Sequence, residues 1–186
     1  MRAVIQRVSR ASVTVGGEQV SSIGPGLCVL LGISADDTQK DAEYMVRKIL
    51  NLRLFEDEEG RAWSRSVMDR HYEVLCVSQF TLQCILKGNK PDFHAAMPAA
   101  LAQPFYQSIL EKLRSSYRPE SVRGEAAADW LQGSVRAQPA PTRAGHQRQR
   151  RSRRGRVLGE GALTLSASVL TGSTRTWSGA ELDGPV

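Results

Sequence analysis

The stretch "SQFTL", Ser78 to Leu82, places two hydroxyls, a carboxamide and an aromatic ring directly after the apolar run "VLCV". Such a run is typical of a buried strand, so these polar groups gather where a strand ends. A serine or threonine hydroxyl becomes a nucleophile at neutral pH when a base, usually histidine, lies beside it. No histidine or carboxylate adjoins the stretch in sequence.

The chain has three histidines that can act as a distant base. We expect His146 to be solvated, because it lies in an arginine-rich stretch. His71 lies too far along an extended chain to reach Thr81. His94 therefore stays open as a base, with a surface or capping role as the commoner alternative.

Without a protein base, Ser78, Gln79, Phe80 and Thr81 are candidates for a site that works by positioning. Backbone N–H groups and the Gln79 carboxamide can donate to a carbonyl or phosphate oxygen. Such a site suits a labile substrate, for example an activated ester that carries its own neighbouring hydroxyl. The alternative is that the two hydroxyls only satisfy backbone groups at the strand end.

Other chemical signals are weak. Lys87 and Gly88, in "KGNKP", can contact a phosphate, although a solvated turn explains them equally well. "EDEE", residues 56–59, is interpreted as an exposed turn rather than a calcium loop. Because no metal-ligand cluster, phosphate-cradling glycine-rich loop or paired-carboxylate spacing is present, we expect no metal and no cofactor.

Apolar periodicity predicts the elements that carry these residues. Gly16-Gly17 favours a two-residue hairpin turn, and "LCVLLGI" favours a strand buried on both faces. A helix is predicted to start at Thr38, where Asp41 completes a near capping box. Its apolar face consists of Ala42, Met45, Val46, Ile49 and Leu50.

After this helix we expect "LRLFEDEEG" to form a strand that leads into a turn at Glu59-Gly60, and then the strand "YEVLCV" that leads to Ser78. A second helix is predicted to start at Pro104, the position in a helix that proline tolerates best. Its predicted apolar face consists of Leu101, Phe105, Ile109, Leu110 and Leu113. The order of elements predicts an α+β fold with a mostly antiparallel, barrel-like core and two main helices.

The chain has 186 residues, of which 41% are hydrophobic and 24% charged, as in soluble globular proteins. Its apolar stretches are too short to cross a bilayer and its N-terminus does not resemble a signal peptide, so we expect a cytoplasmic or nuclear protein with no membrane partner. Cys28, Cys76 and Cys84 lack metal-ligand spacing and are expected to be reduced and packed.

Charge divides the chain into residues 1–122, with a net charge of +1, and a tail of residues 123–186, with a net charge of +5. Seven arginines between Arg143 and Arg156 can attract phosphate polymers without sequence preference. We expect this low-complexity tail to be largely disordered, with at most a short helix at 126–131. "ALTLSASVLTG" regains an alternating pattern and can form a strand.

Several segments together resemble the D-aminoacyl-tRNA deacylase family, in its animal form, over residues 1–122. The segments are "MRAVIQRV", "ASVTVGG", "GLCVLLGI", "KILNLRLFEDEEG", "SQFTL" and "KGNKPDFHAAMP". The combination of "SQFTL" with the following "KG-x-x-P-x-F" is highly specific.

The resemblance implies a homodimer that hydrolyses the ester between a D-amino acid, or glycine, and the 3′ end of tRNA. It implies that the neighbouring ribose 2′-hydroxyl assists, while the protein places the ester and excludes L-amino acids. Ser78, Gln79, Phe80 and Thr81 would then form the pocket floor, with Phe80 on the adenosine side. Ala96 would lie near the aminoacyl group, and Arg7 near the site.

The resemblance stops after the second helix. The family continues with a Gly-Phe-Gly-Ala-like strand and an Asn-x-Gly-Pro-Val-Thr motif, whose Gly-cis-Pro enters the partner's pocket. Here "GEAAADWLQGSV" and the arginine-rich stretch stand in their place, and the terminal Gly184-Pro185 is out of register. We therefore expect weaker rejection of L-substrates and a less stable core. A catalytically impaired isoform that at most binds nucleic acid is the alternative function.

Overall fold

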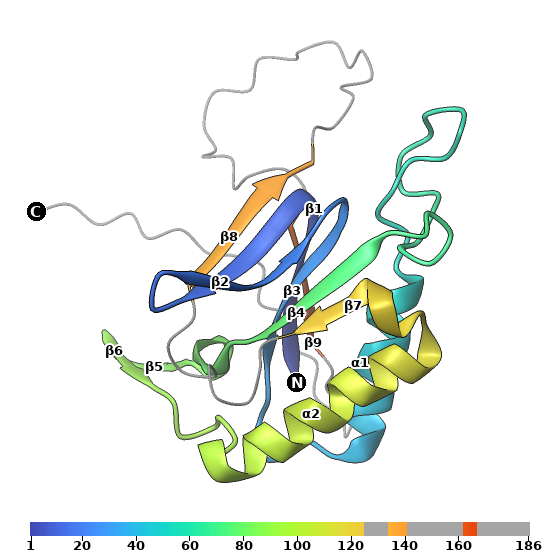
Figure 1. Cartoon of the computed structure of the whole chain (residues 1–186). Helices are drawn as coiled ribbons and strands as arrows, with labels where there is room; N and C mark the ends of the chain where they lie inside the picture. The colour runs from blue at the N-terminus through green and yellow to red at the C-terminus, as the bar shows by residue number, and fades with distance from the viewer. Residues whose placement is uncertain (125–133, 141–161, 167–186) are drawn as a thin grey trace, which may run out of the picture.

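The computed structural model describes residues 1–124, 134–140 and 162–166. Within them a seven-stranded sheet carries two helices on one face, and a separate small hairpin projects from its end (Figure 1). The strands of the sheet are β1 (Arg2–Val15), β2 (Glu18–Ile23), β3 (Gly26–Gly32), β4 (Glu73–Ser78), β7 (Val122–Gly124), β8 (Ser134–Pro139) and β9 (Ala162–Ser166). The other elements are the helices α1 (Gln39–Asn51) and α2 (Ala99–Ser116), the 3-10 turns η1 (Phe80–Gln83) and η2 (Pro119–Ser121), and the hairpin strands β5 (Ile85–Lys87) and β6 (Lys90–Asp92).

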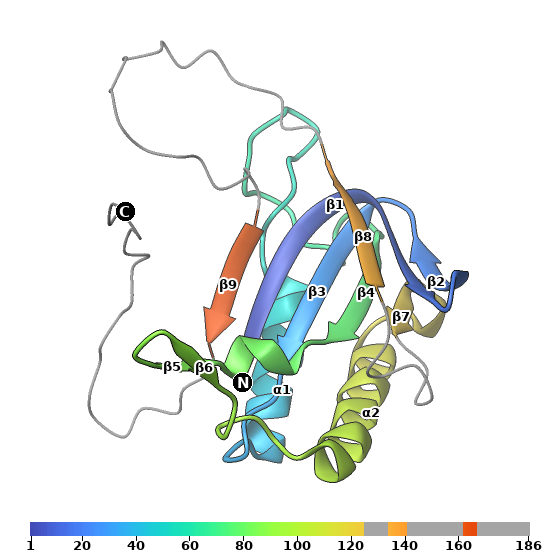
Figure 2. The ribbon, with the colours of Figure 1, turned by 90° about the vertical axis from the view of Figure 1, so that its left-hand side faces the viewer.

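The long strand β1 has partners along both edges. β2 and β3 follow one edge in antiparallel register, which runs from Val8↔Gly26 through Ala11↔Ile23 and shifts between Val13 and Thr14. β1 and β2 are joined by the predicted Gly16-Gly17 turn, whose φ angles of +56° and +90° fit a two-residue hairpin. Because a strand has only two edges, β8 and β9 lie along the other one, each beside one half of β1 (Figure 2).

The α+β class and the two helices are confirmed, but the sheet is mixed. Antiparallel pairing covers β1 with β2, β3, β8 and β9, whereas β3–β4 and β4–β7 are parallel. Parallel neighbours need a long crossover connection, and the two predicted helices are these connections. α1 lies between β3 and β4 in the chain, and α2 between β4 and β7.

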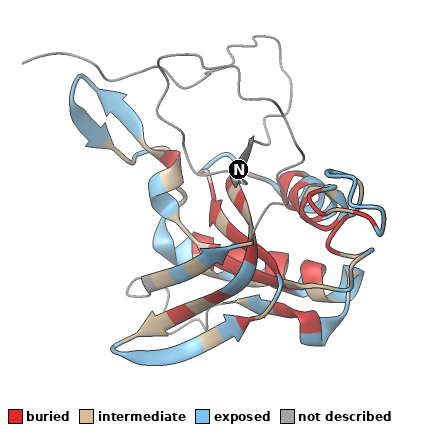
Figure 3. Cartoon of the chain, turned by 90° about the horizontal axis from the view of Figure 1, so that it is seen from above, coloured by how far each residue is buried: buried red, intermediate tan, exposed pale blue. Residues whose placement is uncertain are grey.

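The larger part of the core lies between the sheet and the two helices. It includes Ile5, Leu27, Leu31, Met45, Ile49, Leu110 and Leu113. The buried Tyr106 hydroxyl of α2 donates to the Cys76 carbonyl of β4 at 2.7 Å, which fixes the helix to the middle of the sheet. A second cluster, which includes Val8, Val13, Ile23 and Leu75, covers the opposite face. Figure 3 shows buried residues both in the central strands and in the helices.

α1 forms as predicted. All five expected residues of its apolar face are buried. The Asp41 carboxylate accepts hydrogen bonds from the Thr38 hydroxyl at 2.7 Å and from the Thr38 N–H at 2.9 Å. These bonds stabilise the ionised carboxylate and hold its pKa below the usual value, with the hydroxyl contributing most.

The prediction for the start of α2 is wrong. The helix begins at Ala99, after Pro98 as N-cap, so that Pro104 lies inside it. At this end the buried face is shifted by one residue, to Ala102 and Tyr106, while Leu101 is 62% exposed and Phe105 is partly buried. Ile109, Leu110 and Leu113 are buried as expected.

The strand predicted in "LRLFEDEEG" is also wrong. Only a single bridge, Phe55↔Arg65, forms there. The predicted turn at Glu59-Gly60 does form: the Asp57 carboxylate accepts from the N–H groups of Glu59 at 3.0 Å and of Arg61 at 2.9 Å, and these bonds close it. Glu58 and Glu59 are exposed, as expected for a turn.

Most of the tail, including the predicted helix at 126–131 and Arg143–Arg156, lies outside the described residues. The structure differs from expectation at β8, where Val135 and Ala137 pack against the second core cluster while Arg136 and Gln138 are exposed. The strand expected in "ALTLSASVLTG" is present as β9. Cys28, Cys76 and Cys84 are unpaired by disulfides, and burial raises the pKa of the Cys28 thiol to about 11. No described helix is both long and apolar enough to span a bilayer.

A substitution at Gly26 tests the close pairing of β3 with β4. A Cβ at Gly26 would lie 1.9 Å from the Glu73 carbonyl oxygen, which is backbone and cannot yield. We expect Gly26→Ala to lower the free energy of unfolding by about 3 kcal/mol in urea titrations. Gly24→Ala is the control, because its Cβ would meet only the end of the Glu73 side chain, at 3.3 Å. Equal stability of the two variants would contradict the tight pairing.

Candidate functional site

Ser78 is the last residue of β4 and lies at the end of the sheet where β4 separates from its neighbour β3. It pairs in register with Leu31, which pairs in turn with Ala3 of β1. The next amide, Gln79 N–H, still donates to the Leu31 carbonyl at 2.8 Å. The chain then turns into η1, so the polar residues of "SQFTL" lie at a strand end as predicted.

The 3-10 turn η1 is held against β3 by side chains outside the motif. Gln83, only 4% exposed, donates through Nε2 to the Gly32 carbonyl at 2.8 Å. Arg2 donates to the Leu82 carbonyl at 2.8 Å. Gly32 permits this approach, because a Cβ there would lie 2.7 Å from the Leu82 Cβ and 3.0 Å from the Gln79 carbonyl oxygen.

A cavity of about 300 Å³ opens beside η1. Its lining consists of Ser78, Phe80, Phe93, Ala96, Met97, Pro98 and Ala99. The Phe80 and Phe93 rings meet edge to face, with centroids 5.4 Å apart and planes at 70°. The walls are thus mainly apolar, with the Ser78 hydroxyl as a polar group at the strand end.

The wall opposite η1 is anchored to the chain that follows β3. Met97 N–H donates to the Ile33 carbonyl at 3.0 Å, and Ala35 N–H donates to the Ala95 carbonyl at 3.0 Å. Ser34 forms an isolated bridge with Ala96. Both sides of the cavity therefore depend on the end of β3.

The structure brings three of the candidate residues into the cavity lining: Ser78, Phe80 and Ala96. Gln79 and Thr81 adjoin them on η1, and Gln79 Nε2 donates to the Thr81 hydroxyl oxygen at 2.6 Å. Neither contributes to the lining itself. The motif therefore supplies one wall of the cavity, and the hydrogen-bonded pair of Gln79 and Thr81 lies beside that wall.

The remaining candidates lie elsewhere in the described chain. Lys87 and Gly88 belong to the β5–β6 hairpin, where Gly88 has a φ of +63° and Lys87 forms an ion pair with Asp92. Arg7 lies in the register row of Leu27, about 13 Å along the strand from the row of Ser78. Its guanidinium donates to the Leu54 carbonyl at 3.2 Å.

No described histidine lines the cavity. His94 is exposed, and its Nδ1 lies 2.6 Å from an Asp92 carboxylate oxygen. The Lys87 ammonium, followed by the His94 N–H and ring, holds the pKa of Asp92 well below its usual range. His71 precedes β4 at the opposite end from Ser78, and its carbonyl accepts from Arg118 at 2.8 Å.

Sequence reasoning missed part of the cavity wall and the residues that support η1. Phe93, Met97 and Pro98 complete the wall, and Arg2 and Gln83 support the turn. A polar Gln83 one residue after Leu82 was a signal, because a polar residue beside a buried strand end needs a partner. The described residues contain no group of three or more histidine, cysteine, aspartate or glutamate side chains placed to hold a metal ion.

The family model described as D-Tyr-tRNA(Tyr) deacylase matches residues 4–131, more than half of the chain. The chain belongs to the D-Tyr-tRNA(Tyr) deacylase family. The matched range contains every residue of the cavity lining and of its support on η1, except Arg2.

Curated relatives of this deacylase family carry matching names. D-aminoacyl-tRNA deacylase 1 of Danio rerio is 77% identical over 123 residues, which are 66% of this chain and 59% of that protein. The Homo sapiens relative of the same name is 67% identical over 132 residues, 71% of this chain and 63% of that protein. The chain thus spans less than two thirds of the length of these relatives.

Solved structures agree with the deacylase fold. A structure described as c-Myc DNA Unwinding Element Binding Protein is similar, with a TM-score of 0.77 and 54% identity, over 91% of this chain and 100% of that one. A structure of a probable eukaryotic D-amino acid tRNA deacylase is 15% identical, with a TM-score of 0.65, over 88% of this chain and 96% of that one. At that identity the second likeness shows the fold alone.

Replacing Gln83 tests the support of η1. Gln83→Leu keeps the volume but leaves the buried Gly32 carbonyl without this donor, which we expect to cost about 1–3 kcal/mol of unfolding free energy. Hydrogen exchange of the Leu82 and Cys84 amides, which close η1, should also accelerate. Gln19→Leu, at an exposed position of β2, is the matched control. Unchanged exchange at both amides would refute the supporting role.

Proposed function

We propose that the chain hydrolyses the ester bond of D-aminoacyl-tRNA, and of mischarged glycyl-tRNA, to free amino acid and tRNA. Membership of the deacylase family supports this reaction, as do the names of the most similar relatives. The cavity volume of about 300 Å³ is in the range that small ligands occupy, and suits an aminoacyl group with part of its adenosine. No cofactor takes part in the proposed reaction.

The observation that carries the mechanism is that, within the part of the chain that the structure describes, the cavity lining contains no histidine, carboxylate or lysine. A Ser78 or Thr81 nucleophile would need a base within hydrogen-bond reach. His94 is exposed and does not line the cavity within the described residues, and Thr81 is bonded to Gln79. The site therefore acts by positioning the ester rather than by attacking it.

In this mechanism water adds to the acyl carbon, assisted by the ribose 2′-hydroxyl of the substrate. The bond between the acyl carbon and the ribose 3′-oxygen breaks, and that oxygen takes up a proton. Phe80 lines the cavity and is the first residue of a 3-10 turn, where an amide has no partner within the turn. Its N–H can stabilise the oxyanion that forms on the carbonyl oxygen.

Part of the selectivity follows from the walls of the cavity. Phe80 would face the adenosine, and Ala96 would lie near the aminoacyl group, as the family resemblance implies. Rigid walls reject a side chain of the wrong handedness by steric conflict. Phe80 and Phe93 support each other through their edge-to-face contact and keep the wall in place.

Two further features belong to the proposal. The partner is the 3′ end of aminoacyl-tRNA in the cytoplasm, and the chain acts as a homodimer. Exposed apolar residues near the cavity end of the molecule support a second copy as occupant of this surface. They are Phe80, Ile85, Leu86 and Leu101, which are 45%, 41%, 66% and 62% exposed.

The activity is tested by deacylation of D-Tyr-tRNA and L-Tyr-tRNA by the full chain. We expect hydrolysis of the D-ester in preference to the L-ester. Thr81→Ala should lower kcat/KM and substrate affinity together, each about fivefold, since it removes one positioning hydrogen bond. His94→Ala should change kcat/KM less than about twofold, whereas loss of a general base costs at least about a hundredfold.

Three outcomes would contradict this mechanism. Binding of tRNA without turnover would favour a nucleic-acid-binding module, for which Arg143–Arg156 is the candidate. Loss of turnover in Thr81→Ala with undiminished affinity would indicate a nucleophile. A large loss in His94→Ala would indicate a base.

The homodimer is tested by light scattering coupled to size exclusion. Leu86→Lys places a charge on the most exposed of the four apolar residues and should convert a dimer into a monomer. Trp63→Lys is the matched control, because Trp63 is an apolar residue of similar exposure, 58%. It lies in the loop that leads into the start of β4, whereas the cavity lies at the other end of that strand. A monomeric parent chain, or a dimeric Leu86→Lys variant, would refute this interface.

A further inference from the structure

The solvent face of α1 carries one aromatic residue among three cations. Lys40, Tyr44, Arg47 and Lys48 follow one another at helical spacing and share this face, which we call the α1 stripe. The Tyr44 ring is 40% exposed, with Lys48 Nζ at 5.4 Å and Arg47 Cζ at 5.8 Å from its centroid. Cations at such distances are attracted by the face of the ring and keep it oriented.

The cations of the α1 stripe are available for an anionic ligand. None of the three forms an ion pair with a carboxylate among residues 1–124. Glu43, the acidic neighbour of Tyr44, is bound to Lys112 of α2 at 3.1 Å, and Asp41 is buried as the helix cap. Asp36, in the loop before the helix, is an exposed carboxylate at this end. The face as a whole stays positive.

The α1 stripe begins beside the cavity. Ser34, in the loop that leads into α1, forms the bridge with Ala96 of the cavity wall. Lys40 follows in the first turn of the helix, and Lys48 lies about 12 Å further along the axis. The stripe therefore leads away from the cavity wall along the surface.

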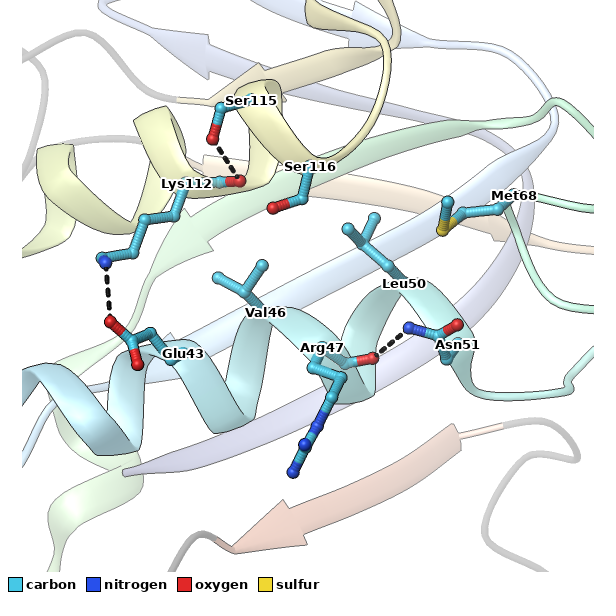
Figure 4. A pocket seen from close by; sticks show the side chains of 9 residues that line it. All are labelled: Glu43, Val46, Arg47, Leu50, Asn51, Met68, Lys112, Ser115 and Ser116. Carbon is cyan, nitrogen blue, oxygen red and sulfur yellow. Dashed lines mark hydrogen bonds and ion pairs between the residues drawn. The ribbon is translucent and has the colours of Figure 1, made fainter.

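At its far end the α1 stripe reaches a groove of about 450 Å³ between the C-terminal parts of α1 and α2 (Figure 4). Arg47, Asn51 and the Glu43 carboxylate line the groove from α1, and Ser115, Ser116 and Lys112, which is paired with Glu43, line it from α2. Figure 4 shows the Arg47 side chain on the side of α1 away from the Glu43–Lys112 ion pair. Cations, hydroxyls and amides of this kind are the usual partners of phosphate oxygens.

We propose that the α1 stripe binds the RNA strand that leads out of the cavity. Lys40, Arg47 and Lys48 contact its phosphates, and the Tyr44 ring stacks on a base or ribose. An aromatic ring within a row of cations is the arrangement by which proteins hold single-stranded nucleic acid without reading its sequence. The inference rests on the proposed function, because it takes the substrate to be a tRNA ester.

The test measures binding of uncharged tRNA by the full chain at several salt concentrations. Arg47→Ala/Lys48→Ala should raise Kd about tenfold and make the slope of log affinity against log salt shallower by about 1.4, from two lost phosphate contacts on a single strand. Tyr44→Ala should raise Kd about fivefold with the slope unchanged, because stacking releases no counterions. The control is Arg10→Ala/Arg123→Ala, which removes two exposed cations from β1 and β7 and should leave Kd within about twofold.

A second measurement separates this proposal from the proposed function. The ratio of kcat/KM for D-Tyr-tRNA to that for the D-tyrosyl ester of adenosine should fall about tenfold in the α1 stripe double variant. If neither substrate is hydrolysed by the parent chain, the proposed function fails while the tRNA affinities still decide the role of the stripe. If the stripe variants bind tRNA as the control does, the α1 face is only a solvated surface and this proposal is overturned.

Discussion

The close approach of η1 to β3 at Gly32 is the constraint on which the cavity depends. A side chain at this position would run into the Leu82 Cβ, which would lie at 2.7 Å. With glycine there, the turn that carries Phe80 can lie directly against the sheet, and Gln83 can reach the Gly32 carbonyl. The opposite wall is bonded to the residues just after Gly32, through Ile33 and Ala35. Both walls are therefore attached to the same short stretch of backbone at the end of β3. Hydrogen bonds to this stretch set the distance between the walls.

The chemistry of the site follows from what this arrangement leaves out of the cavity lining. The polar groups closest in sequence, Lys87, Asp92 and His94, bind one another on the hairpin. Because the pKa of Asp92 lies well below its usual range, its carboxylate is ionised at neutral pH and holds the Lys87 ammonium and the His94 ring on the hairpin surface. Apolar walls and backbone amides are then the means left for acting on a bound ester. Such a site accelerates a reaction by orientation and by stabilising developing charge, which is sufficient for a substrate that is already labile.

Local sequence patterns predicted what depends on neighbours in the chain. The Gly16-Gly17 turn, the cap of α1 and the strand end at Ser78 each depend on a few adjacent residues, and all three are confirmed. The parallel pairing of β3 with β4 was missed, although an apolar run buried on both faces and a helix between two strands are typical of parallel neighbours. Pro104 misled the prediction for α2 because a proline tolerated inside a helix has the same local signature as one that begins it.

Some residues of the candidate site were likewise predictable from local sequence, and others were not. Residues of the motif were found because they are contiguous, whereas Arg2 reaches η1 from 80 residues away in sequence. Its role depends on β1 being fixed beside β3, which no local pattern reveals. For Arg7 the opposite holds. Its place in the strand was predictable from the sequence. Its distance from Ser78 was not, because that distance depends on the register of β1 with β3 and of β3 with β4.

The outer edge of β1 bears on how this fold tolerates a sequence that departs from its family. An open edge of this length would expose a row of unpaired N–H and C=O groups. β8 and β9 cover it through backbone hydrogen bonds, and such bonds require an extended chain rather than a particular sequence. The edge can therefore be closed by segments unrelated to those of the family. A motif that has to place a specific ring or carbonyl in a pocket has no such freedom, because its effect depends on which atoms it presents. Sequence divergence after α2 should therefore affect the closure of the sheet less than it affects selectivity between D- and L-amino acids.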